Sequence, residues 1–193
     1  MKIINLTENS DIYTSNAYLL LGAWNALSDV NTLIDTGRDP AVFDRLEEIN
    51  TGVGKRRVEQ VILTHTHFDH CAVLGEVNKR YSPVAYSFSP FEAAGKRLRD
   101  GMKLIVADTT AEVIHTPGHS HDSVCLYFEK EEILFAGDSP VVVLSKGFKY
   151  EEDFVSAMKR ISRRPIKTIY FGHGAPMTQG AQEAIRRTLK NIS

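Results

Sequence analysis

The sequence contains little cysteine and no long hydrophobic run. Cys71 and Cys125 are the only cysteines among 193 residues. Two cysteines are too few for the disulfide framework of a small secreted domain, so we expect free thiols. No apolar stretch is long enough to span a bilayer, and residues 1–8 become polar and acidic at once, unlike a secretory signal. These absences predict a cytoplasmic protein with no membrane partner.

An excess of charge of either sign is also missing. The chain has 23 basic and 24 acidic residues and a formal net charge of −1, so no broad electrostatic attraction favours nucleic acid as a partner. We expect a small-molecule substrate instead. With 42% hydrophobic residues, no repeat and no linker rich in proline, glycine or serine, residues 1–193 are predicted to form a single domain.

Short apolar runs alternate with stretches that have helical spacing, which predicts an α/β fold. Nine runs rich in β-branched or aromatic residues are candidate strands: Lys2–Leu6, Ala17–Leu21, Thr32–Ile34, Val61–Thr64, Val84–Phe88, Glu112–His115, Val124–Phe128, Ile133–Ala136 and Thr168–Phe171. Four helices are predicted, beginning after Asp39, after Ser89, and over Glu151–Ser162 and Gln179–Asn191. These elements suffice for two sheets with helices against them.

The segment His65-Thr66-His67-Phe68-Asp69-His70 places three imidazoles and a carboxylate directly after a candidate strand. His65 and His67 are two residues apart, so on an extended backbone their side chains leave the same face. Asp69 and His70 follow at the turn and can point to a neighbouring position. The segment therefore predicts a metal site with room for two ions.

Other strands end in the same kind of residue. Thr116-Pro117-Gly118-His119, Gly137-Asp138 and Gly172-His173 follow apolar runs, and Asp35 follows Leu33-Ile34. Glycine permits the tight turn that lifts the next side chain over a sheet edge, and a rigid sheet can hold such side chains together. The convergent set comprises His65, His67, Asp69, His70, His119, Asp138 and His173.

Four ordered motifs in this sequence resemble those of the metallo-β-lactamase fold superfamily. They are Thr64–His70, Thr116–Ser120, Ala136–Ser139 and Phe171–Gly174. The resemblance implies a four-layer αββα sandwich with the site at one edge. It also implies that His65, His67 and His119 bind one metal, that Asp69, His70 and His173 bind the other, and that Asp138 bridges them. Asp35 matches a residue that supports the site by a hydrogen bond to a ligand histidine.

The nitrogen and oxygen ligand set suits zinc and also iron or manganese. Two divalent ions roughly 3.5–4 Å apart can hold a hydroxide near neutral pH and polarise a carbonyl. We therefore predict a dinuclear hydrolase of a small ester, thioester or lactone, in which Asp69 orients the attacking hydroxide. The motifs are most similar to those of glyoxalase II, although the chain ends twenty residues after His173, without the helical extension of that family.

Several alternatives stay open. One is a mononuclear iron oxidoreductase resembling the persulfide dioxygenases, which retain similar motifs. The others are a phosphodiesterase and a non-catalytic metal-binding or interaction protein. The insert Pro140–Tyr150, which includes Val141–Tyr150, is a lid, a pocket wall or a homodimer contact. His115, His121 and Cys71 are interpreted as packing or surface residues rather than ligands, and Trp24 fits either the core or a pocket.

Overall fold

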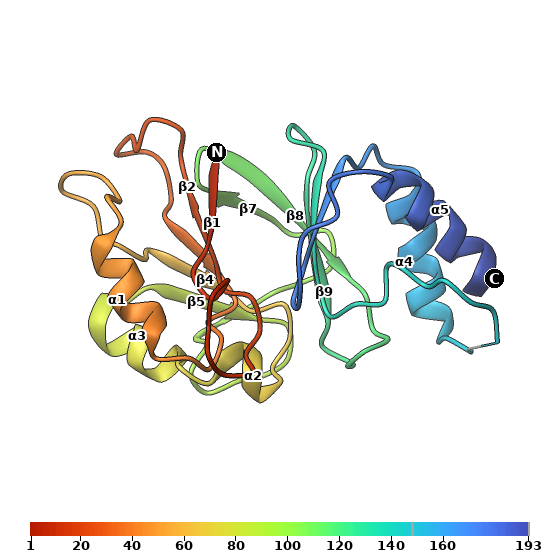
Figure 1. The fold of residues 1–193 in the computed structure, drawn as a ribbon, viewed down its shortest axis with the longest axis horizontal. Coiled ribbons are helices and arrows are strands. Elements are labelled where there is room, and N and C mark those ends of the chain that lie inside the picture. Colours follow the sequence, from red (N-terminus) through yellow and green to blue (C-terminus); the bar gives the residue numbers. More distant parts are fainter. Residues whose placement is uncertain (148, 193) are drawn as a thin grey trace.

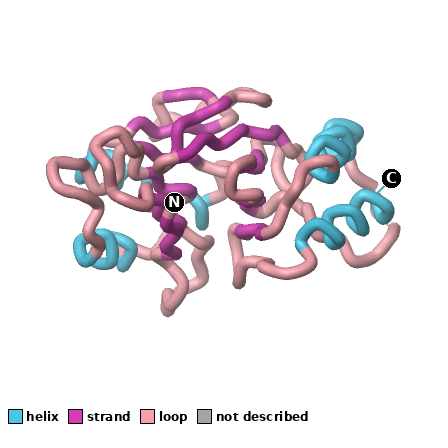
Figure 2. The backbone as a smooth tube through the Cα atoms, turned by 90° about the horizontal axis from the view of Figure 1, so that it is seen from above, coloured by secondary structure: helices cyan, strands magenta, loops and turns pink. Residues whose placement is uncertain are grey.

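Two β-sheets pack face to face in the computed structural model, which describes residues 1–147 and 149–192. Helices cover the outer face of each sheet, with α1 and α3 on one side and α4 and α5 on the other (Figure 1). Figure 2, turned by 90°, shows the same order, with helices flanking the strands at both ends. The predicted αββα sandwich is confirmed.

The first sheet has the strand order β1-β2-β3-β4-β5-β6. Its strands are β1 (Lys2–Asn5), β2 (Tyr18–Leu21), β3 (Thr32–Ile34), β4 (Gln60–Ile62), β5 (Val84–Ser87) and β6 (Lys96–Arg97). The strands from β1 to β3 are antiparallel, and those from β3 to β6 are parallel. Parallel neighbours need a crossover, which α1 (Ala41–Glu48) supplies between β3 and β4, and α2 (Phe68–Cys71) with α3 (Leu74–Tyr81) between β4 and β5.

The second sheet has the order β11-β10-β9-β8-β7. Its strands are β7 (Lys103–Val106), β8 (Thr109–His115), β9 (Val124–Phe128), β10 (Ile133–Gly137) and β11 (Thr168–Phe171). Only β10 and β11 are parallel, and α4 (Glu152–Ser162) makes their crossover. The last helix, α5 (Ala181–Ile192), packs beside α4. No helix in the described part of the chain is long and apolar enough to cross a bilayer.

The side chains of β2 show how one strand serves two layers. Successive side chains point to opposite faces of a sheet. Tyr18 and Leu20 therefore enter the core between the sheets, while Leu19 and Leu21 pack toward α1 and α3. All four are buried, and each leucine contributes about 1.5–3 kcal/mol by leaving water. This core on both faces holds the strand ends in fixed positions.

The helix predicted after Ser89 is wrong. The Ser89 hydroxyl is hydrogen-bonded to Nε2 of His121, 3.0 Å away, rather than capping a helix. Phe91 and Ala94 form an isolated bridge, and β6 begins two residues later. The residues between β5 and β6 form a turn that joins the two strands, which leaves too few residues for a helix.

The sequence interpretation also omitted α2, where it placed Asp69 and His70 at a turn, and α3, β6 and β7. Gly75 lies in the first turn of α3 and weakens its propensity signal, although Leu74 and Val77 pack into the core. The edge strands β6 and β7 have two and four residues, which is too short for a clear alternation. The hairpin with β7 starts β8 at Thr109 rather than at the predicted Glu112.

The insert after Asp138 begins as a packed segment. Val141 and Val143 are buried in the core beneath α4 and α5. The Val143 N–H donates to Oγ1 of Thr188 at 2.7 Å, and Nδ2 of Asn191 donates to the Val143 carbonyl at 2.7 Å. Its first residues therefore form a wall fixed to α5. Phe148, in the same insert, lies outside the described residues.

Candidate metal centre

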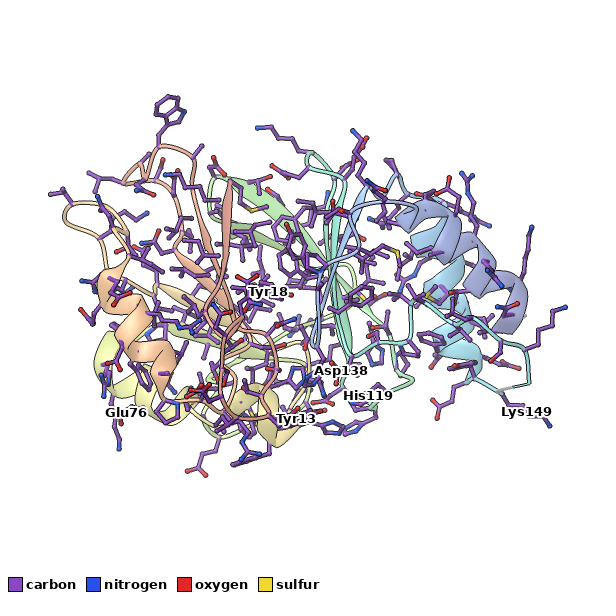
Figure 3. All side chains as sticks on the ribbon, viewed as in Figure 1. Tyr13, Tyr18, Glu76, His119, Asp138 and Lys149 are labelled. Atoms are coloured by element: carbon purple, nitrogen blue, oxygen red, sulfur yellow. The ribbon has the colours of Figure 1, made fainter. Side chains whose placement is uncertain are left out.

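The predicted ligands lie where strands of both sheets end. His65 and His67 follow β4, and Asp69 and His70 lie in α2. The remaining ligands follow strands of the second sheet: His119 after β8, Asp138 after β10 and His173 after β11. In Figure 3 His119 and Asp138 lie together at the lower edge of the two sheets, and their closest atoms are 3.6 Å apart. The structure brings all seven predicted residues to one edge.

His65, His67 and His119 make up what we term the three-histidine group. Nε2 of His119 lies 2.9 Å from Nδ1 of His67. The His65 ring centroid is 4.5 Å from that of His67 and 4.9 Å from that of His119. One ring nitrogen of each residue lies within 4.8 Å of the others. This spacing is compatible with one ion that bonds each nitrogen at about 2 Å.

Asp69, His70 and His173 make up a second group, which we term the aspartate group. Nε2 of His173 lies 3.1 Å from Oδ2 of Asp69, and Nε2 of His70 lies 3.9 Å from the same oxygen. These ligand atoms also lie within 4.8 Å of one another. The group combines two imidazoles with a carboxylate, a set that suits a second divalent ion.

The Asp138 carboxylate lies between the two groups. Its Oδ2 is 3.4 Å from Nε2 of His70, 3.6 Å from Nε2 of His173 and 3.6 Å from Nε2 of His119. The first two neighbours belong to the aspartate group and the third to the three-histidine group. A single oxygen is therefore in reach of both positions.

Three ring nitrogens at this edge are buried and lack a hydrogen-bond partner of good geometry: Nε2 of His65, His70 and His173. Buried polar atoms are normally satisfied, so three such atoms converging on nearby carboxylates fit bound cations. Gly172 keeps the space open, since a Cβ there would lie 2.1 Å from Oδ1 of Asp138 and 2.7 Å from Cε1 of His70. The donor set and the space fit divalent metal.

Asp35 supports the aspartate group from behind. Its Oδ2 is 2.9 Å from Nδ1 of His70, and its carboxylate accepts hydrogen bonds from the N–H and the hydroxyl of Thr64, both at 2.7 Å. Asp35 has a φ of 54°, a left-handed conformation that aspartate tolerates. The predicted hydrogen bond to a ligand histidine is confirmed. It fixes the ring so that Nε2 faces the site.

The two groups differ in their proton affinity. Burial, together with the neighbouring His70, lowers the pKa of His65 to about 4. Burial also disfavours the charged form of His70, but the Asp35 and Asp138 carboxylates outweigh it and raise its pKa to about 10. For Asp138, burial is outweighed by the close approach and charge of His70, and its pKa falls to about 2. In the metal-free protein His70 therefore carries the proton that balances two carboxylates.

A cavity of about 290 Å³ adjoins the site on the side of the insert. Pro140, Val142 and Phe171 form its apolar wall, and His119, Asp138 and His173 face it from the metal side. Tyr13 stacks on the His173 ring with centroids 5.1 Å apart and is 71% exposed. The site is thus open to a ligand that has an apolar part.

The histidines interpreted as packing residues lie outside the two groups. His115 stacks on Phe88 with centroids 4.0 Å apart and contacts the His121 carbonyl through Nε2 at 2.8 Å. Cys71 is buried, and its Sγ donates to the carbonyls of Thr66 and His67 rather than facing the ligands. Trp24, for which the sequence left two interpretations, is 91% exposed, so it lies in neither core nor pocket.

Asn16 is a site-building residue that the sequence interpretation missed. Its Nδ2 donates to the carbonyls of Phe171 and Gly174, both at 2.9 Å, and its N–H donates to the Gly172 carbonyl at 2.6 Å. These contacts hold the turn that carries His173 against the first sheet. No local sequence signal marks this role, because the partners lie more than 150 residues away.

Comparison with known proteins adds an independent line of evidence. An atrochrysone carboxyl ACP thioesterase from Aspergillus fumigatus is 29% identical over 163 residues, covering 80% of this chain and 51% of that protein. The lactamase-like protein aptB from Emericella nidulans is 31% identical over 165 residues, covering 77% and 52%. The chain spans about half the length of these curated relatives.

Solved structures share the fold. ETHE1 from Myxococcus xanthus superposes with a TM-score of 0.73 at 19% identity, covering 98% of this chain and 85% of that one. The family model described as the metallo-beta-lactamase superfamily matches residues 11–173, a range that includes every candidate ligand. This chain belongs to the metallo-beta-lactamase superfamily.

Proposed function

We propose that this chain is a dinuclear metal-dependent hydrolase that cleaves a thioester. The observation that supports two ions is the position of Asp138, whose Oδ2 lies within 3.6 Å of ligand nitrogens in both groups. The carboxylate can serve as a bridging ligand. Zinc fits the nitrogen and oxygen donors, and iron or manganese would fit them as well.

Two bound divalent ions would supply a hydroxide near neutral pH and polarise the substrate carbonyl. The protein would hold them through the seven ligand side chains. Asp69 has a second role in this proposal, because its Oδ2 is fixed beside Nε2 of His173 at 3.1 Å. With the ions bound, that oxygen would accept a hydrogen bond from the attacking oxygen and orient it toward the carbonyl carbon. The same carboxylate can carry the proton to the departing thiolate.

The cavity supports an acyl substrate. Val142 and Phe171 offer apolar surface within the same cavity as Asp138 and His173, so an acyl chain can bind there while its carbonyl faces the ligands. Tyr13, stacked on the His173 ring, adds an exposed aromatic surface next to a residue that lines the cavity. The name of the Aspergillus fumigatus relative, a carboxyl ACP thioesterase, favours a thioester over the ester and lactone alternatives.

A metal and substrate assay tests the proposal. The protein is chelated, reconstituted with zinc, iron or manganese, and assayed on matched acyl thioester, oxyester, lactone and phosphodiester substrates, with metal content measured by elemental analysis. We expect about two metal ions per chain and fastest cleavage of the thioester. Asp69→Asn, loaded with the same metal, should lose about 100-fold or more in kcat, within the range of general-base contributions.

Two results would contradict the proposal. One iron per chain, with oxygen consumed when a persulfide is supplied, would favour the oxidoreductase alternative. Cleavage of the phosphodiester alone would favour a phosphodiesterase. If metal-loaded Asp69→Asn kept the wild-type kcat, only the catalytic role given to Asp69 would be wrong, and the hydrolase proposal would stand.

A further inference from the structure

Asp122 is a buried carboxylate next to the site that the proposed chemistry does not use. It is 2% exposed. Its Oδ2 accepts a hydrogen bond from Oγ1 of Thr66 at 2.7 Å, and its Oδ1 accepts one from Oγ of Ser120, also at 2.7 Å. Short bonds to both oxygens are typical of an ionised carboxylate. Asp122 thus joins two loops whose contacting residues are 56 positions apart in the sequence.

The two hydrogen-bond partners of Asp122 show which segments it connects. Thr66 lies between His65 and His67, and Ser120 directly follows His119. Both residues that Asp122 holds are therefore immediate neighbours of the three-histidine group. Asp122 accepts hydrogen bonds from side-chain hydroxyls next to the candidate ligands in sequence, whereas Asp35 contacts a ligand ring itself.

The three-histidine group needs such a support. His67 and His119 lie on exposed segments after their strands, and their close contact, at 2.9 Å, is with each other. Side chains on loops are held less precisely than those on strands or helices, so a metal site built on loops depends on contacts behind the ligands. Ser123 also holds Ser120 in place, since its Oγ accepts a hydrogen bond from the Ser120 N–H at 3.2 Å.

We propose that Asp122 is a positioning residue that preorganises the three-histidine group for metal, in the same way that Asp35 orders the aspartate group. The inference rests on the proposed dinuclear centre. Asp122→Ala should weaken zinc binding at the three-histidine group by about 10–100-fold, the usual cost of losing a contact behind a ligand. The zinc affinity of the aspartate group should change little.

The test is a zinc titration of metal-free wild type and variants against a chromophoric chelator, with NMR spectra of the histidine ring nitrogens identifying the rings that bind. Thr66→Val and Ser120→Ala each remove one hydrogen bond to Asp122, and each should give a smaller loss of zinc affinity in the same group. Asp35→Asn should weaken the aspartate group instead. Asp29→Asn is the matched control, because Asp29 is a buried carboxylate that accepts the Ala26 N–H away from the ligands.

The outcomes separate the two proposals. Two zinc ions in the wild type, with Asp122→Ala affinity unchanged or weakened equally at both groups, would overturn the positioning role alone. Wild-type protein that leaves the three histidines unbound would overturn the dinuclear centre together with this inference. If Asp122→Ala does not fold, Thr66→Val and Ser120→Ala decide the question. Thermal unfolding of each variant separates lost stability from lost metal binding, and saturating zinc should restore kcat in Asp122→Ala.

Discussion

The two groups of candidate ligands would each hold a divalent metal ion, but a buried histidine in each group has a pKa shifted in the opposite direction. In the three-histidine group, burial and the neighbouring His70 lower the pKa of His65 to about 4. In the aspartate group, the Asp35 and Asp138 carboxylates outweigh the effect of burial on His70 and raise its pKa to about 10. Metal binding requires deprotonated ligands, so at neutral pH His65 is ready for an ion, whereas His70 must first release a proton. Similar ligand types therefore give two sites with different dependence on pH.

Asp138→Ala should give the largest effect, because Asp138 is the residue that the two groups share. Its Oδ2 lies 3.4 Å from His70 and 3.6 Å from His119. Loss of a shared ligand removes several kcal/mol of transition-state stabilisation, or about 10³-fold in kcat/KM. Kinetics on the thioester and elemental analysis check this. Loss of metal from one group alone would contradict a bridging role.

Gly172→Ala should give the next largest effect. The added Cβ would lie 2.1 Å from Oδ1 of Asp138 and 2.7 Å from His70, so these two ligands must move. We expect about 1–3 kcal/mol of lost stability, as for other overpacked sites, together with weaker metal binding in the aspartate group. Denaturant unfolding and zinc titration measure both. Gly75→Ala is the matched control, since nothing lies within 4 Å of its Cβ position, and it should be neutral or stabilising.

Asp35→Asn tests whether the two groups can be uncoupled. Asparagine keeps the left-handed backbone of this position but weakens the support of Nδ1 of His70, 2.9 Å away. Zinc affinity of the aspartate group should fall by about 10–100-fold, whereas the three-histidine group should retain its ion. Stepwise zinc titration distinguishes the groups. Equal losses at both would show that they behave as one unit.

The last prediction is that the stability of the metal-free protein depends on pH. His70 has a raised folded pKa of about 10, so its stabilising contribution is fully present below the unfolded histidine pKa of about 6.5 and is lost as pH rises toward 10. His65, with a pKa lowered to about 4, acts in the opposite direction and destabilises the fold as pH falls from about 6.5 to 4. Urea unfolding of chelated protein across this range measures both. Asp35→Asn should flatten the slope above pH 7.

Most of the strands could be predicted from the sequence because their signal is local. Thr32–Ile34, Val124–Phe128 and Thr168–Phe171 are strands with the predicted bounds. The helix predicted after Ser89 is wrong because the residues there form a turn between β5 and β6, with Phe91 and Ala94 paired in an isolated bridge. Short edge strands such as β7 depend on pairing with a partner strand, and a local sequence pattern does not predict which strand that is.

The sequence by itself determined the chemistry of the site: which residue types end each strand, the order of the motifs and hence the family. Spacing of two residues between His65 and His67, and glycine before Asp138 and His173, are local constraints that any fold of this chain must satisfy. Only the tertiary structure decided which residues lie together in each ligand group and which hydrogen bonds support them. The contacts of Asn16, Asp35 and Asp122 join segments that are distant in the chain. The Asp35 contact forms when β3 and β4 pair within the first sheet, and the Asn16 and Asp122 contacts form when the two sheets pack. Tertiary structure, rather than sequence proximity, brings these partners within hydrogen-bond distance.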